Sequence, residues 1–215
     1  MKSWKKKCEP DWNLDVGDER TCPIVSSIRS LGFRVCRGAR GGIVSNNLLE
    51  RITRKKAHIG VIGQGYVGLP LALVFREAGF TVTGFDVDPA KVAAIGRGES
   101  FIRHIGAQRV ADAVRSGEYT ATADFDRLSR CDAVLICVPT PLGLHREPDN
   151  SFIHATAREI ASRLRRDQLI VLESTTYPGT TDEEVLPILE KSGLHCPDDF
   201  LLAFSPERED PGNEK

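Results

Sequence analysis

The sequence predicts an α/β protein with a doubly wound parallel sheet, and three observations support this fold class. An apolar run at 58–62, rich in β-branched residues, breaks into a glycine-rich turn and then into an apolar helical stretch. A continuous apolar run at 133–138 is typical of a central parallel strand that is buried on both faces. Strand and helix patterns alternate to the end of the chain, and this order joins parallel strands through helical crossovers.

The composition is that of a globular domain with one sizeable core. The chain has 215 residues, of which 40% are hydrophobic and 27% are charged. The apolar runs are much shorter than the roughly 20 residues of a membrane-spanning helix, so we expect no membrane partner. The basic start of the chain has no apolar segment behind it. We therefore expect no secretory signal and a cytoplasmic location.

Charge divides the chain into two regions. Residues 1–57 hold 13 lysines and arginines against 6 acidic residues, a net charge of +7, whereas the remainder carries −8. Residues 1–45 show no sustained helical or strand period, so we expect an irregular or disordered basic extension before a domain at 46–215. The arginines of this extension are not interleaved with aromatic residues that stack on bases. The sequence therefore favours a solvated arm over nucleic-acid binding.

The six cysteines do not form a metal-binding pattern. None of them makes a C-x-x-C pair, and no histidine lies near the first three, so we expect no zinc or other metal site. Reduced thiols are the expected state in a cytosolic protein. Cys137 falls inside the apolar run at 133–138, where a thiol is more often core packing than a nucleophile.

The first elements follow from local signals. Asn46 or Asn47 can cap a short helix over 48–56, which leads directly into the strand at 58–62. The helix after the glycine-rich turn starts near Val67 and ends at Ala78, where Gly79 can adopt the left-handed cap conformation.

The glycine-rich turn has the spacing of a dinucleotide-binding turn. Gly63 permits a tight turn, Gly65 lets the backbone approach a pyrophosphate, and Gly68 lets the helix pack closely on the strand. The N–H groups of the first helical turn and the positive end of the helix dipole would hold the anion. Because a lone G-x-G-x-x-G pattern is weak evidence, its neighbours have to support this interpretation.

Asp86 supplies that support. It ends the second predicted strand, at 81–86, and lies 21 residues beyond Gly65. A dinucleotide-binding fold has at this distance a carboxylate that accepts hydrogen bonds from the adenosine ribose. A carboxylate would repel a 2′-phosphate, so the sequence favours NAD over NADP as the cofactor.

The next helix begins with a clear signal. Asp88 can act as its N-cap and Pro89 fits its first turn. Lys91, one turn further on, can bring its ammonium group to the ribose or to a phosphate.

The remaining elements continue the alternation of strands and helices. Asp124 can cap a short helix through Leu128, Thr181 and Glu184 form a capping-box pattern, and Pro187 is expected to kink the helix that they start. The other expected elements are helices at 108–116 and 152–164, strands at 119–121, 168–172 and 200–204, and a polar loop at 142–150.

Polar residues follow the predicted strands. Ligands of an open parallel sheet bind at the carboxyl ends of its strands, so these residues are expected to converge on one edge. They are Gln64–Tyr66, Asp86, Thr140, Glu173–Thr176 and Glu207.

These residues and their neighbours resemble the UDP-glucose/GDP-mannose dehydrogenase family over residues 46–213. Six motifs agree with the family in order and spacing: GQGYVGLPLA (63–72), FDVD (85–88), ICVPTPL (136–142), REPD (146–149), ESTTYPGTT (173–181) and FSPEREDPGN (204–213). The REPD and SPEREDPGN motifs look most like the branch that oxidises N-acetylated UDP-hexosamines, which includes UDP-N-acetylglucosamine 6-dehydrogenase. The UDP-glucose branch usually has phenylalanine where this chain has Arg208.

The resemblance implies a Rossmann-type NAD-binding domain and an oxidation of a nucleotide sugar. The family oxidises the C6 hydroxymethyl group of a nucleotide sugar to a carboxylate, with two NAD and a cysteine thiohemiacetal and thioester, in the synthesis of surface polysaccharide precursors. A UDP-sugar, UDP-N-acetylglucosamine or a related compound, is then the expected partner.

The resemblance also implies a role for each matching residue. Gly63, Gln64, Gly65, Tyr66, Val67 and Gly68 would hold the pyrophosphate. Asp86 and Lys91 would bind the adenosine end, although the family often has arginine where Lys91 provides a single ammonium instead of a planar fork. Thr140 and Thr176 would face the nicotinamide side, and Glu173 would also bind the cofactor. Glu207, with Thr176, would be catalytic, since a carboxylate can accept a proton from a water, and Arg208 would frame the sugar.

The resemblance ends before several parts of the family. Its catalytic cysteine and lysine, the central helix through which members form homo-oligomers, and the substrate domain all lie beyond the matched stretch, and no cysteine here matches the nucleophile. Without that thiol the second oxidation has no covalent route, so we expect an N-terminal portion that is inactive alone.

Two alternatives stay open, and the first of them is from another functional class. The chain could be a non-catalytic NAD-binding module or remnant that needs a partner chain. It could also be a hydroxy-acid dehydrogenase of the same fold, although SPEREDPG has no role there.

Overall fold

The structure is a computed structural model that describes residues 46–102, 105–141 and 148–205. The expected basic extension, residues 1–45, and two expected site residues, Glu207 and Arg208, lie outside these ranges. Within them, every helix falls short of the length and apolar character needed to cross a membrane.

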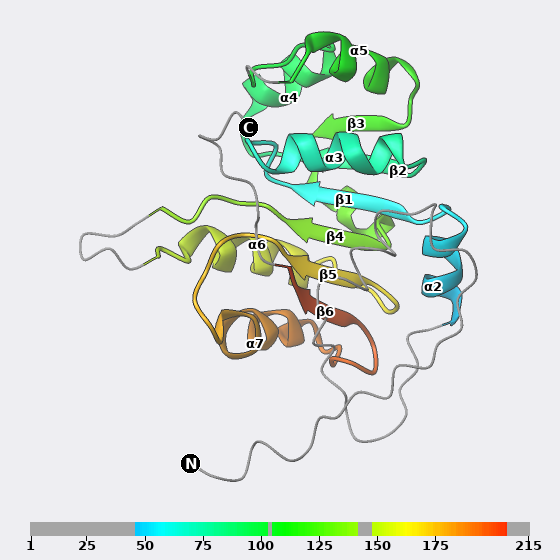
Figure 1. The fold of residues 1–215 in the computed structure, drawn as a ribbon. Coiled ribbons are helices and arrows are strands. Elements are labelled where there is room, and N and C mark those ends of the chain that lie inside the picture. Colours follow the sequence, from blue (N-terminus) through cyan, green and yellow to red (C-terminus); the bar gives the residue numbers. More distant parts are fainter. Residues whose placement is uncertain (1–45, 103–104, 142–147, 206–215) are drawn as a thin grey trace.

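In the described ranges, six parallel strands form one sheet in the order β3-β2-β1-β4-β5-β6 (Figure 1). The strands are β1 (His58–Ile62), β2 (Thr81–Phe85), β3 (Tyr119–Thr122), β4 (Ala133–Ile136), β5 (Leu169–Leu172) and β6 (Leu201–Phe204). This order confirms the predicted doubly wound parallel sheet. β1 pairs with β2 on one side and with β4 on the other, so the strand order reverses between β1 and β4, where such sheets bind ligands.

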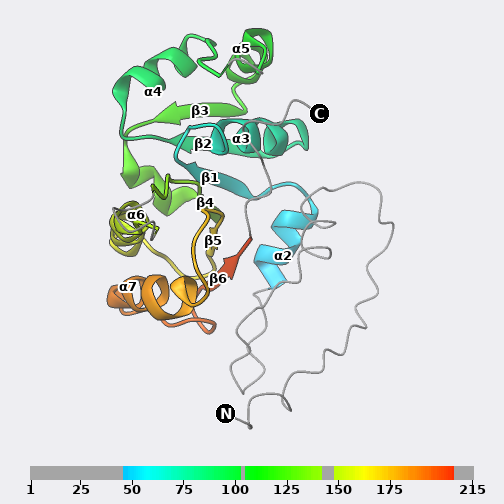
Figure 2. The ribbon, with the colours of Figure 1, turned by 60° about the vertical axis from the view of Figure 1, so that its left-hand side comes forward.

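Helices cover both faces of the sheet. They are α2 (Asn46–Thr53), α3 (Gly68–Glu77), α4 (Pro89–Gly96), α5 (Ala107–Arg115), α6 (Ser151–Ala161) and α7 (Leu186–Leu189), with short turns η1 (Phe125–Arg130), η2 (Thr180–Val185) and η3 (Glu190–Ser192). Figure 2 shows α2 and α3 on one side of the sheet and α6 and α7 on the other.

Each face has its own hydrophobic core. One core joins the sheet to side chains of α2, α3, α4 and α5, such as Leu48 and Leu73. The other joins it to η1, α6 and α7 through residues such as Leu128, Ile153 and Leu189. All four residues of β4 are buried, as expected of a strand that is covered on both faces.

Local signals placed several helix ends correctly. The side chain of Asp88 caps α4 by accepting from Ala90 N at 2.9 Å, and Asp124 caps η1 by accepting from Asp126 N at 3.0 Å. Gly79, after α3, has φ +92°, in the left-handed region that the C-cap prediction requires.

Other helix and strand ends differ from the prediction. α2 ends at Thr53 and not at 56, because Lys55 turns the chain with φ +58° and the amides of Lys56 and Ala57 both donate to Arg51 O. β4 ends at Ile136, before Cys137, and α6 ends at Ala161, three residues early.

The predicted capping box at Thr181 and Glu184 is wrong. The segment begins instead as the wide π turn η2 after Gly179, with no side-chain cap at that residue, and Glu184 bonds to Asn150. Pro187 explains the wide turn, because in an α-helix its ring would clash with the carbonyl four residues earlier. The proline lies in the first turn of α7, so it starts a helix and does not kink one.

A buried aspartate organises the amino-terminal edge of the sheet. The carboxylate of Asp132 accepts from His58 N at 2.8 Å, and its Oδ1 lies 2.7 Å from guanidinium nitrogens of both Arg51 and Arg165. Only 2% of this side chain is exposed. Since Arg51 belongs to α2, the carboxylate ties α2 to the start of β1 and β4.

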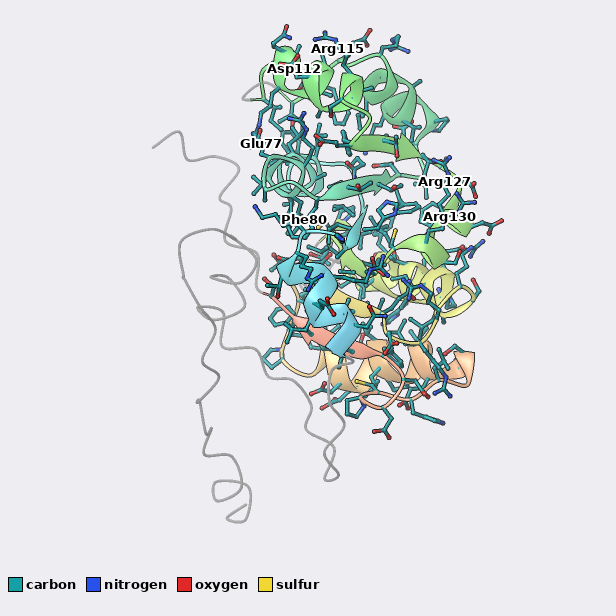
Figure 3. The ribbon with its side chains drawn as sticks, turned by 90° about the vertical axis from the view of Figure 1, so that its right-hand side faces the viewer. Glu77, Phe80, Asp112, Arg115, Arg127 and Arg130 are labelled. Carbon is teal, nitrogen blue, oxygen red and sulfur yellow. The ribbon has the colours of Figure 1, made fainter. Side chains whose placement is uncertain are left out.

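His58 makes this edge sensitive to pH. Burial lowers the pKa of His58, Asp132 opposes this effect, and Arg127, Arg51 and Arg130 add to it. Figure 3 looks onto this edge and shows Arg127 and Arg130 there. The histidine is therefore neutral in the folded protein under conditions in which it is already protonated in the unfolded chain.

The lowered pKa of His58 predicts a loss of stability in mild acid. The unfolded chain takes up the proton near pH 6.5, whereas the folded chain takes it up at a lower pH. The contribution of neutral His58 to the free energy of unfolding is therefore fully present above pH 6.5, and it is lost as the pH falls from there through the folded pKa. We expect the free energy of unfolding in urea to fall from pH 7.5 to pH 5.5. In a His58→Gln variant the fall should be smaller, because glutamine takes up no proton in this pH range. Equal falls in the two proteins would contradict the prediction.

Candidate functional site

The segments that follow β1, β2, β4 and β5 leave the sheet at its carboxyl-terminal edge. In Figure 1 the arrowheads of β1 and β4 point to the same side, and β2 and β5 run parallel to them. The described residues predicted for the site lie in these segments and in the first turn of α4: Gly63–Gly68, Asp86, Lys91, Thr140, Glu173 and Thr176. Glu207 and Arg208 fall outside the described ranges.

The three glycines of the turn have three different environments. Gly63 has φ +90°, and a Cβ there would lie 2.5 Å from the backbone oxygen of Cys137. A Cβ at Gly68 would lie 1.8 Å from Gly63 O, so only glycine lets α3 approach the end of β1. A Cβ at Gly65 would meet nothing within 4 Å. The turn is thus closed by Gly63 and Gly68 and leaves open space at Gly65.

The amino terminus of α3 faces this turn. Val67 occupies the N-cap position and has no polar side-chain atom with which to cap the helix. Leu69 N and Leu71 N donate to Gly65 O and Val67 O, in the turn just before the helix. The positive end of the helix dipole at this start without a side-chain cap is suited to an anion. Tyr66, in the same turn, is 60% exposed.

Gln64 departs from its expected role at the pyrophosphate. Its side chain is fully buried, with Nε2 donating to Val61 O at 2.8 Å and Oε1 accepting from the hydroxyl of Tyr119 at 2.6 Å. Its backbone N donates to Asp86 Oδ2 at 2.8 Å. The side chain therefore supports the turn from beneath. Gly84 makes room for it, and a glycine within a strand was the sequence signal for that close approach.

Tyr119 belongs to the same buried support. Burial raises its pKa, and the nearby charge of Asp86 adds to the rise. The phenol therefore stays protonated and donates its hydrogen to Gln64, linking the turn to β3.

Asp86 is held in one orientation at the end of β2. Oδ2 accepts from Gln64 N, and Oδ1 accepts from Asp88 N at 2.9 Å. Lys91, in the first turn of α4, brings its Nζ to 3.5 Å from Oδ2. Each carboxylate oxygen can accept more than one hydrogen bond, so Asp86 keeps capacity for the hydroxyls of a ribose. Val87, which follows it, is 82% exposed and offers an apolar surface beside that position.

The ends of β4 and β5 are joined by backbone and hydroxyl contacts. Glu173 N donates to Ile136 O at 3.0 Å, and the buried Ser174 donates through Oγ to Val138 O at 2.7 Å. These bonds set the start of the segment that carries Thr176 against the segment that carries Thr140. Both threonines are half-buried. Ser174 belongs to the predicted polar group Glu173–Thr176, but its contact with the backbone after β4 was not predicted.

Thr176 belongs to a polar cluster that the sequence did not predict. Its hydroxyl lies 3.2 Å from Asn150 Oδ1 and 2.8 Å from Thr180 Oγ1. Glu184 and His154 extend the cluster, with a distance of 2.6 Å between Oε2 and Nε2. A spacing of four residues from Asn150 to His154, and again from Thr180 to Glu184, was the available signal.

The cysteines and acidic residues give the described part of the chain no metal site. In those residues no group of three or more histidine, cysteine and acidic side chains is placed to hold an ion. Cys137 is 8% exposed and packs in the core, as predicted. Burial raises the pKa of Cys131 to about 12, with Asp132 adding to the rise, so this thiol is a poor nucleophile.

The edge thus offers three kinds of contact in one row. In the order of the strands β2, β1 and β5, a diol fits the carboxylate of Asp86, an anion fits the open turn at Gly65, and a polar group fits the hydroxyl of Thr176. A dinucleotide carries these groups in the same order.

Comparison with known proteins gives a family match. Residues 57–214 match the model of the UDP-glucose/GDP-mannose dehydrogenase family, NAD binding domain. A UDP-N-acetyl-D-glucosamine 6-dehydrogenase of Pseudomonas aeruginosa is 35% identical over 162 residues, which are 75% of this chain and 37% of that protein.

Solved structures agree with this match. An NDP-N-acetyl-D-galactosaminuronic acid dehydrogenase from Methanosarcina mazei Go1 has a TM-score of 0.68 and 33% identity, covering 76% of this chain and 37% of that one. A ternary complex of GDP-mannose dehydrogenase from Pseudomonas aeruginosa has a TM-score of 0.68 and 31% identity, covering 71% of this chain and 36% of that one. The chain therefore spans little more than a third of the length of these relatives.

Proposed function

We propose that this chain, which belongs to the UDP-glucose/GDP-mannose dehydrogenase family, is the NAD-binding part of a nucleotide-sugar 6-dehydrogenase. NAD is the cofactor of the family domain that it matches. We propose a UDP-N-acetylhexosamine as the substrate of the whole protein, because relatives named for UDP-N-acetyl-D-glucosamine and UDP-N-acetyl-D-mannosamine are 33–36% identical to the chain.

One observation supports the proposal more than any other. The open space at Gly65 lies at the uncapped start of α3, and the backbone of the neighbouring Gln64 donates to the carboxylate of Asp86. A pyrophosphate at the turn and an adenosine ribose at Asp86 would fit residues that the fold already holds rigidly. A side chain larger than hydrogen at Gly65 would occupy the space that the pyrophosphate needs.

The chain's own residues would divide the work as follows. The turn and the start of α3 bind the pyrophosphate, Asp86 and Lys91 orient the adenosine end, and Thr176, with Thr140 and Glu173, holds the nicotinamide end. NAD supplies the acceptor for the hydride that leaves C6 of the sugar. Glu207 accepts a proton from water, and Arg208 contacts the sugar.

Cofactor binding is a better test than turnover. Cys131 and Cys196 precede β4 and β6, at the edge away from the glycine turn, and Cys137 is buried in the core. None of these three described thiols is placed to trap an aldehyde at the carboxyl-terminal edge, so we do not expect NADH formation by the 215 residues alone.

The test is a comparison of NAD with NADP by isothermal titration calorimetry on the 215-residue chain. We expect NAD to bind at least about 10-fold more tightly, because the 2′-phosphate of NADP would lie beside the carboxylate of Asp86. An Asp86→Asn variant should reduce this preference, and Asp112→Asn, an exposed carboxylate on α5, is the matched control. Equal affinities of the wild-type chain, or binding of neither dinucleotide, would overturn the proposal.

A further inference from the structure

A hydrogen-bonded network lies between the start of α6 and the π turn η2, behind the segment that carries Thr176. Its side chains come from two segments that are distant in sequence, 150–154 and 176–184, and are half-buried or buried, except for Tyr177. They are Asn150, His154, Thr176, Tyr177, Thr180 and Glu184. Asn150 is 6% exposed and Thr180 is fully buried.

The carboxylate of Glu184 fixes the orientation of the Asn150 amide. Glu184 Oε2 lies 3.0 Å from Asn150 Nδ2 and 2.6 Å from His154 Nε2, and Oε1 accepts from the hydroxyl of Tyr177. An ionised carboxylate can only accept hydrogen bonds, so the amide nitrogen must face Glu184. The amide oxygen of Asn150 then faces Thr176.

The charge of Glu184 is maintained by its partners. Burial alone would raise its pKa, but hydrogen bonds from Tyr177, Asn150 and His154 outweigh burial and lower the pKa below its usual value. The group therefore remains an acceptor at neutral pH.

The orientation of Asn150 in turn fixes the hydroxyl hydrogen of Thr176. The two inward neighbours of that hydroxyl are Asn150 Oδ1, which can only accept, and Thr180 Oγ1, at 2.8 Å. Thr180 can give its own hydrogen to Tyr177 O at 3.1 Å, so it too can accept from Thr176. The hydrogen of Thr176 is therefore directed inward, and the hydroxyl keeps a lone pair for a ligand.

We propose that Glu184 is a positioning residue that, through Asn150, makes Thr176 a hydrogen-bond acceptor for the carboxamide of the cofactor. The inference rests on the proposed function, which puts the nicotinamide end beside Thr176. A carboxamide NH2 can donate to this hydroxyl. A carboxylate in the same position has no hydrogen to donate, so the network selects nicotinamide over its acid.

Replacement of Glu184 by glutamine keeps the shape of the side chain but no longer fixes the orientation of the Asn150 amide. The new amide can donate to Asn150 Oδ1, so Asn150 can turn over and present Nδ2 to Thr176. The hydroxyl of Thr176 then accepts from within the protein and can donate outward, which suits a carboxylate as well as a carboxamide.

The experiment measures three ligands on the 215-residue chain by calorimetry: NAD, its nicotinic-acid analogue (deamido-NAD) and ADP-ribose, which lacks the ring. We expect the wild-type chain to bind NAD about 5-fold more tightly than deamido-NAD, the effect of one hydrogen bond. Glu184→Gln should bring this ratio close to 1 with ADP-ribose affinity unchanged. Glu183→Gln, an exposed neighbour on the same turn, should keep the wild-type ratio.

The possible outcomes separate the inference from the proposed function. Failure of the wild-type chain to bind ADP-ribose would reject the proposed function itself. The role of Glu184 would be rejected if the ratio of NAD affinity to deamido-NAD affinity were unchanged in Glu184→Gln. It would also be rejected if that variant lost affinity for all three ligands in parallel. Should that variant not fold, Thr176→Val is the second test, and it should remove the preference for NAD without affecting ADP-ribose.

Discussion

Replacement of Gly65 by alanine is expected to weaken NAD binding about 100-fold without lowering the thermal unfolding midpoint. A Cβ at this position meets no protein atom within 4 Å, and the backbone φ is not in the left-handed region, so the fold accepts the methyl group. The methyl group would occupy the space proposed for the pyrophosphate. Displacement of that group would remove one or two charge-assisted hydrogen bonds, at about 1.5–3 kcal/mol each.

Calorimetry with NAD and a thermal melt of each variant provide the check. Gly96→Ala is the matched control, because a Cβ there also meets nothing within 4 Å and the residue lies at the far end of α4. The control should bind NAD as the wild-type chain does. An alanine at Gly65 that leaves NAD affinity unchanged would show that the pyrophosphate does not lie at this turn.

Replacement of Asp132 by alanine is expected to lower the free energy of unfolding by about 3 kcal/mol. The carboxylate is almost completely buried and accepts from His58 N, Arg51 and Arg165. Its loss would leave two guanidinium groups and one backbone amide without their acceptor. The two arginine side chains are 41% and 35% exposed, so water can partly replace the bond, which keeps the cost near the lower end of the range for a broken buried pair.

Urea unfolding of this variant should be compared with that of Asp126→Ala. Asp126 also bonds an arginine, Arg163, at 2.7 Å, but 81% of its side chain is exposed, so its removal should cost less than about 1 kcal/mol. Similar losses in the two variants would show that burial of Asp132 does not matter. NAD affinity should be unchanged in Asp132→Ala wherever it is folded, because this residue lies at the amino-terminal edge.

Features set by neighbouring residues were predictable from the sequence. The alternation of strands and helices determines the doubly wound sheet, and Asp88 and Gly79 mark helix ends through contacts or backbone angles within a few residues. The glycine turn and Asp86 were found in the same way, because their spacing along the chain decides their meeting at one edge.

Features set by distant residues were not predictable. Glu184 fits the sequence pattern of a capping box. Its carboxylate instead accepts a hydrogen bond from Asn150, 34 residues away, and not from the nearer backbone. The side chain of Gln64 lies beneath the turn because Tyr119, 55 residues later, provides a donor there. No local pattern reports such a partner, since it depends on how the sheet brings the segments together.

The strand order has a consequence for the sequence of folding events. β1 meets β2 through residues such as His58 and Thr83, 25 positions apart, whereas it meets β4 near Asp132, 74 positions from His58. Closing the longer loop costs about 1 kcal/mol more chain entropy, so we expect the pair of β1 and β2 to form before β4 joins. Gly63 packs against the backbone of Cys137, just after β4. The glycine-rich turn therefore takes its final shape only when β4 has joined β1.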